Sequence, residues 1–204
     1  MPDHDYTMTI SLNVLNHLGL NLYSNVPAVL SEVVANSYDA DAERVEITVD
    51  PGAGTVTIID DGHGMTRTEV NDRFLNVGYE RRVDGAAITP KHQRAVMGRK
   101  GIGKLSLFSI ANTVEVYTAR DGELSALAMS VPKIREVLDA QKKGTSKEPY
   151  HPTPLATDSI DFEQGTKIVL RDLKKGIANA AAALRTRLAR RFRFLARTRS
   201  SSSS

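Results

Sequence analysis

The segment SEVVANSYDA contains three side chains that can bind a metal ion or activate water. If it is helical, Glu32, Asn36 and Asp39 fall within an arc of roughly 60° beside the apolar stripe. An acid and an amide one helical turn apart can hold a water molecule and a metal ion. A solvated polar face is the alternative interpretation of the same spacing.

The segment IIDDGHGM places a carboxylate at the end of an expected strand. Strand alternation puts Val56, Ile58 and Asp60 on one side, so Asp60 points where its apolar neighbours point. A buried carboxylate is costly unless it accepts hydrogen bonds. Asp60 is therefore a candidate acceptor for an exocyclic amine such as adenine N6. A tight turn in which Asp60 caps the next helix is the alternative.

The residues that follow Asp60 suit a flat ligand. Gly62 and Gly64 allow positive φ and close approach, and Met65 offers a polarizable surface for an aromatic ring.

The segment VMGRKGIGKLSLFS, residues 96–109, has P-loop spacing at Gly98, Gly103 and Lys104. Leu105 stands where a P-loop needs Ser or Thr, and the preceding residues are polar rather than a buried strand. We therefore expect a different anion-binding loop, whose N–H groups converge on a phosphate where a helix begins. A flexible solvent loop is the alternative.

Hydrophobic periodicity outlines a mixed order of elements. It does not alternate as a doubly wound parallel sheet requires, and a sheet with helices on one face fits better. A long polar loop is expected over 78–100. Helices are expected at 10–20, 26–40, 66–77, 102–111, 131–141 and 174–196, and strands at 44–50, 55–60, 113–119, 123–130 and 165–173, with weak strand or loop at 151–162.

Composition indicates a soluble globular protein, with 41% hydrophobic and 25% charged residues. There is no cysteine, which excludes disulfides and thiolate metal sites and suits a cytoplasmic location. We expect neither a signal peptide nor a membrane span. From Leu173 onward there are nine Lys or Arg and no acid, whereas the rest has 18 basic and 24 acidic residues.

Taken together and in order, these segments resemble the GHKL superfamily. Its members include DNA gyrase, the ninety-kilodalton heat-shock chaperones, histidine kinases and MutL. Gly165-Thr166 at the start of a strand looks like the last family motif. The resemblance covers roughly residues 10 to 172 and is closest to the chaperone, MutL and MORC side.

The resemblance implies an α+β two-layer sandwich, the Bergerat fold, with a mixed, mainly antiparallel sheet and helices on one face. It implies ATP and Mg²⁺ as ligands, Glu32 as general base and Asn36 as metal ligand. Asp60 would bind adenine N6, with Thr166 helping through a water, and residues 78–104 would form a lid. The implied nucleotide-binding residues are Asn36, Asp39, Asp60, Gly62, Gly64, Met65, Gly98, Gly101, Gly103, Lys104 and Thr166.

The resemblance also implies an ATPase that closes its lid and pairs as a homodimer. The domain would span 1–172, followed by a basic helix at 173–196 and a low-complexity, disordered tail at 197–204. A histidine kinase is disfavoured, because only His4 and His17 precede Glu32.

Two alternatives remain open. The chaperone and MutL branches continue into a second domain that supplies a lysine to the γ-phosphate. We see none here, so the chain would bind ATP with slow or absent turnover. The other alternative is nucleic-acid binding through the basic tail. The client or partner protein is not indicated.

Overall fold

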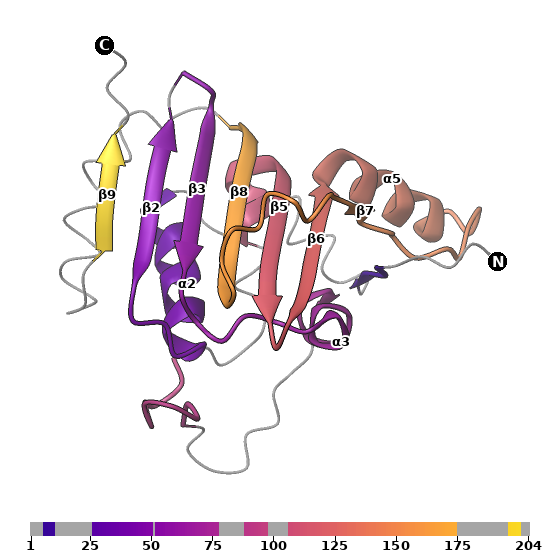
Figure 1. Ribbon diagram of the computed structural model, residues 1–204. Helices are drawn as coiled ribbons and strands as arrows, with labels where there is room; N and C mark the ends of the chain where they lie inside the picture. The colour runs from indigo at the N-terminus through magenta and orange to yellow at the C-terminus, as the bar shows by residue number, and fades with distance from the viewer. Residues whose placement is uncertain are drawn as a thin grey trace.

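The computed structural model describes residues 6–10, 26–50, 52–77, 88–97, 106–174 and 196–200. Within these residues the chain folds around one large sheet (Figure 1).

The large sheet has seven strands in the order β7-β6-β5-β8-β3-β2-β9. Neighbouring strands are antiparallel except β2 and β9, which are parallel. The expected mixed, mainly antiparallel sheet is therefore confirmed. The strands are β2 (Val45–Asp50), β3 (Thr55–Asp60), β5 (Ala111–Arg120), β6 (Glu123–Ser130), β7 (Thr153–Pro154), β8 (Gly165–Leu173) and β9 (Ala196–Ser200).

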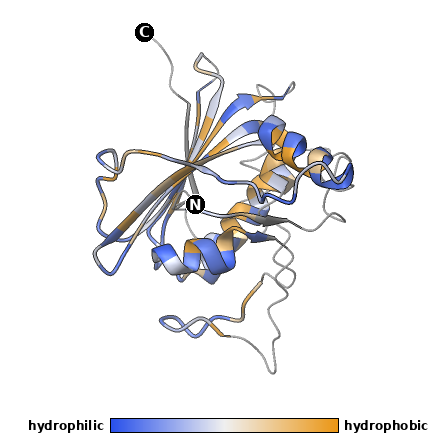
Figure 2. Ribbon diagram, turned by 90° about the vertical axis from the view of Figure 1, so that its right-hand side faces the viewer, coloured by the Kyte–Doolittle hydropathy of each residue, from blue (hydrophilic) through white to orange (hydrophobic). Residues whose placement is uncertain are grey.

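The helices lie against one face of this sheet, as Figure 2 shows from the side. They are α2 (Val26–Asp39), α4 (Leu107–Ile110) and α5 (Val131–Lys142). A short helix, α3 (Arg67–Glu69), continues as a π-helical turn, η1 (Val70–Phe74). β1 (Thr9–Ile10) and β4 (Asn76–Val77) form a separate two-stranded parallel sheet.

The core lies between the helices and the inward face of the sheet. The β2–β3 hairpin pairs Ile47 with Ile58, and both side chains are fully buried. Strand alternation places such residues on one side, where they meet Leu30 and Val33 of α2 in the same apolar cluster. This packing fixes the side of β3 on which Asp60 lies.

Several expected elements have different boundaries in the structure. The helix expected at 66–77 ends at Phe74, and Asn76–Val77 is a strand because it pairs with β1. Of the helix expected at 102–111, the described part is α4, and Ala111 already begins β5. The expected 10–20 and 174–196 helices lie mostly outside the described residues.

The tail was expected to be disordered over 197–204, but its described part belongs to a strand. Residues 196–200 form β9, because their backbone pairs with the edge of β2. Such pairing depends on backbone groups, which a composition bias towards Arg and Ser does not reveal.

Within the described ranges, no helix is both long and apolar enough to cross a membrane.

Candidate functional site

Asp60 is the last residue of β3, and its side chain lies inside the protein with 9% of the residue exposed. Its Oδ2 accepts a hydrogen bond from the Ser37 hydroxyl of α2 at 2.9 Å. Its Oδ1 accepts one from the Gly62 N–H at 3.0 Å. The carboxylate thus joins the end of β3 to α2, and its expected inward orientation is confirmed.

Burial raises the pKa of Asp60 to about 6. The hydrogen bonds from Ser37 and Gly62 and the nearby His63 oppose this rise, whereas the Asp61 charge adds to it. A carboxylate that loses water without enough donors holds its proton more tightly. Asp60 is therefore ionised at neutral pH and titrates in a mildly acidic range.

The glycines after Asp60 serve a purpose that the sequence did not indicate. Gly64 has φ +63°, and a Cβ there would lie 2.0 Å from the Ala119 carbonyl oxygen. A Cβ on Gly62 would lie 2.9 Å from atoms of Ala40 and of Asp60. Their immediate role is therefore to let the loop pass close to β5 and to the end of α2.

Gly165-Thr166, at the start of β8, lies beside the backbone of Asp60. Gly165 has φ +130°, and a Cβ would lie 2.2 Å from the Asp60 carbonyl oxygen. Thr166 is the strand partner of Asp60. This explains in physical terms why a glycine precedes the threonine.

Thr118 of β5 is a site residue that sequence reasoning missed. Its buried hydroxyl accepts the Met65 N–H at 2.9 Å and donates to the Gly165 carbonyl at 3.0 Å. It also lies 3.4 Å from the Thr166 hydroxyl. Its position two residues after Val116, on the inward side of an alternating strand, was the available signal.

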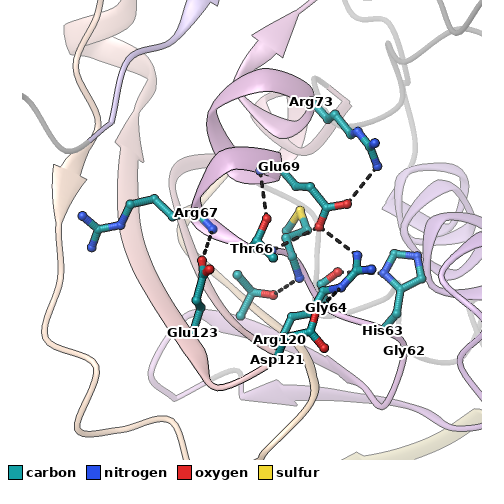
Figure 3. Close-up of polar contacts among 12 residues, drawn as sticks. Gly62, His63, Gly64, Thr66, Arg67, Glu69, Arg73, Arg120, Asp121 and Glu123 are labelled. Carbon is teal, nitrogen blue, oxygen red and sulfur yellow. Dashed lines mark hydrogen bonds and ion pairs between the residues drawn. The ribbon is translucent and has the colours of Figure 1, made fainter.

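The loop after Asp60 is held from its far end by α3 (Figure 3). Thr66 and Glu69 form a capping box, in which each side chain accepts the other's backbone N–H. Glu69 also pairs with Arg73 at 2.9 Å and with Arg120 at 2.8 Å. These contacts tie the loop to the end of β5.

Burial tends to raise the pKa of Glu69, but the Thr66 N–H and the charges of Arg120 and Arg73 outweigh it and lower the pKa. Glu69 therefore stays ionised and keeps these contacts at neutral pH.

Glu32, Asn36 and Asp39 all belong to α2. Glu32 and Asp39 are half-buried and Asn36 is exposed. Ser37 follows Asn36 directly and reaches Asp60, so this helix borders both halves of the candidate site. Ser37 was missed, although its spacing of four from Val33 put it on the inward face.

The expected lid segment meets α2 where it is described. The Met97 N–H donates to Asp39 Oδ1 at 2.7 Å. Four other predicted site residues lie outside the described residues: Gly98, Gly101, Gly103 and Lys104.

Comparison with known proteins identifies relatives of this arrangement. The model of the family described as "Histidine kinase-, DNA gyrase B-, and HSP90-like ATPase" matches residues 23–166. A Herpetosiphon aurantiacus protein named "Putative type II restriction enzyme HgiDII" is 40% identical over 195 residues, 94% of this chain and 30% of that protein. Chaperone protein HtpG of Halorhodospira halophila is 32% identical over 127 residues, 52% of this chain and 20% of the chaperone. The chain spans less than a third of the length of either relative.

Proposed function

Because the chain belongs to the histidine kinase-, DNA gyrase B- and HSP90-like ATPase family, we propose that it binds ATP with Mg²⁺ and hydrolyses it beside α2. The observation that carries this proposal is Asp60, a buried carboxylate whose acceptor capacity is only partly used by the residues that the structure describes. A buried polar group without a full set of partners favours a ligand that supplies the missing donor.

Asp60 would accept the N6 amine of adenine. An ionised carboxylate has about four lone-pair sites, and the described contacts use two of them, for Ser37 and Gly62. Thr166, the strand partner of Asp60, would assist through a water, and Met65 would line the base. Gly62 and Gly64 would leave room for the base as well as for the backbone contacts described above.

The α2 face would bind the phosphates and the metal. Asn36 presents an exposed side-chain amide between two acids on the same helix face, and oxygen donors of this kind suit Mg²⁺. Asn36 would hold the ion, which neutralises phosphate charge when bound. Glu32, one turn before Asn36, would polarise the attacking water, and Asp39 would lie one turn after Asn36 on the same helix.

Within residues 78–104, the described part 88–97 would anchor a lid whose remainder ATP orders, with N–H groups of Gly98, Gly101 and Gly103 and the charge of Lys104 facing the phosphates. Ordering would promote pairing of two chains. The contact between Met97 and Asp39 supports this proposal, because it joins the described part of this segment to the nucleotide helix.

The proposal is tested by calorimetric titration with ATP, with and without magnesium, together with measured phosphate release. We expect magnesium-dependent binding, and we expect Glu32→Ala to bind ATP while losing about 10²- to 10⁴-fold in turnover. Turnover that survives this substitution would remove Glu32 as the base. Binding without any release in the wild type would leave a nucleotide-binding module.

A second candidate function is action on nucleic acid, which the basic composition after Leu173 and the name of the Herpetosiphon relative favour. A gel shift that weakens steeply with salt, and disappears in a chain ending at 173, would support it.

A further inference from the structure

Asp41 is a buried acid that the nucleotide proposal leaves unassigned. It lies two residues beyond the end of α2, has φ 61°, and is 5% exposed. Among the described residues it has three hydrogen-bond donors, and these three belong to the segment 88–97: the Thr89 hydroxyl, the Lys91 N–H at 2.8 Å and the His92 N–H at 3.1 Å. One carboxylate thus binds a segment about fifty residues further along the chain.

The segment 88–97 is built around the same contact. Thr89 is 1% exposed, and its hydroxyl also accepts the Arg94 N–H at 3.1 Å. Ile88 and Ala95 form a β-bridge that closes the loop. The loop therefore has its own hydrogen-bonded shape, with the Asp41 carboxylate as its acceptor at one end.

Arg94 attaches the other side of this loop to the end of α2. Its guanidinium donates to the Ala42 carbonyl at 2.8 Å and lies 4.8 Å from the centre of the Tyr38 ring. Three residues later, the Met97 N–H reaches Asp39. The loop thus approaches α2 at Tyr38, Asp39, Asp41 and Ala42.

From this geometry we propose that Asp41 is a positioning residue for the nucleotide site: by binding 88–97 it holds the Met97 N–H on Asp39 and so fixes that carboxylate beside Asn36. The nucleotide part of this inference rests on the proposed function. The contact itself does not. Asp41 contacts the segment 88–97, so it would act on the nucleotide site through Met97 and Asp39.

Electrostatics favours a permanent contact. Burial tends to raise the pKa of Asp41, but the hydrogen bonds from Thr89, Lys91 and His92, with the His92 charge, lower it. The group is therefore ionised throughout the neutral range. Hydrogen bonds to an ionised acceptor are stronger than those between neutral groups.

The decisive variant is Asp41→Asn in the full chain, with Glu43→Gln as control. Asparagine keeps the shape but cannot accept at both ends. Glu43 pairs with Lys91 of the same segment at 2.8 Å, through an exposed contact. Amide NMR in the ligand-free state gives the first readout. We expect the Met97 N–H signal to move in Asp41→Asn, and the Gly62 N–H signal, which reports on Asp60, to stay.

Two further measurements accompany the spectra. Trypsin should cut after Lys91 and Arg94 about tenfold faster in Asp41→Asn, because the segment opens more often. Calorimetry should show ATP affinity reduced about tenfold. Glu43→Gln should match the wild type in both. Thr89→Val, which removes one donor from the other side, should shift Met97 in the same direction by less, and it replaces Asp41→Asn if that variant fails to fold.

An unchanged Met97 signal in these variants would overturn the inference. So would wild-type ATP affinity in a variant whose Met97 signal has moved. If the wild type itself does not bind ATP, the proposed function fails. The Met97 signal then still decides whether Asp41 fixes the contact with Asp39.

Discussion

Asp41 and Asp60 are both buried, with 5% and 9% of the residue exposed. Their surroundings nevertheless shift their pKa values in opposite directions. Asp41 accepts three hydrogen bonds from the residues that the structure describes, and its pKa is lowered. Asp60 accepts two from the same part of the chain, and burial raises its pKa to about 6. The balance between lost hydration and the hydrogen-bond donors that replace it decides whether each pKa rises or falls.

This difference separates a structural acid from a candidate binding acid. The carboxylate oxygens of Asp41 accept hydrogen bonds from the protein itself, and they join two segments that are distant in sequence. Asp60 accepts fewer hydrogen bonds from the described residues, and its ionised form is therefore less stable inside the protein. We expect an amine donor from a ligand to stabilise the ionised form.

The largest change in stability should come from displacing the loop after Asp60, whose Gly62 N–H donates to the Asp60 carboxylate. Gly64→Ala puts a Cβ against the Ala119 carbonyl, and we expect a loss of about 3 kcal/mol or more in unfolding free energy. Gly54→Ala is the matched control, since Gly54 also has φ +63° but has open space around it. It should lose about 1 kcal/mol. Equal losses in urea denaturation would show that the close approach carries no cost.

Asp60→Asn should weaken ATP binding about 10- to 100-fold by calorimetry, because a charged acceptor for the adenine amine is lost. In the ligand-free state at pH 8 the same variant should be as stable as the wild type or more stable, since no buried charge remains. Unchanged ATP affinity would remove Asp60 from the proposed binding site.

The pH dependence provides a third test. Because the folded-state pKa of Asp60 is raised from 3.8 to about 6, its contribution to stability is full below pH 3.8 and is lost as pH rises through 6. ATP affinity should run the other way, falling about tenfold from pH 7.5 to 5 as the acceptor is protonated. Both trends are measured relative to Asp60→Asn, which cancels titration of the phosphates. Parallel profiles for the two proteins would contradict the assignment.

The smallest effect is expected at the exposed edge of the Asp41 contact. Glu43→Gln removes the pair with Lys91, and exposed pairs of this kind contribute little. We expect no measurable change in melting temperature, at low or high salt. A clear loss would mean that this pair, and not Asp41 alone, holds the segment.

The sequence was most informative where periodicity is strong. The hairpin of β2 and β3, the helix α2 and the inward side of Asp60 all follow from alternating or helical apolar residues that pack in one core. The resemblance to the GHKL superfamily is confirmed by the family match over 23–166. Short motifs in a fixed order thus carried more information than any one motif alone.

What the sequence could not supply were contacts between distant segments. Asp41 meets Thr89 across 48 positions, in a stretch without periodicity. Gly64 has to be a glycine because a carbonyl of β5 lies close to it. From the sequence, this glycine suggested only space for a base, and its role in backbone packing was not visible. In both cases a tertiary neighbour decides the role of the residue.

The place of Asp60 within the sheet has a consequence for the choice of base. Its backbone is paired on both sides, with Val45 of β2 and with Thr166 of β8, so the carboxylate has little freedom to retreat. Guanine carries a carbonyl oxygen where adenine carries an amine. On the proposed role, GTP would bring two lone-pair-bearing oxygens face to face, and the domain should discriminate against it without any dedicated steric barrier.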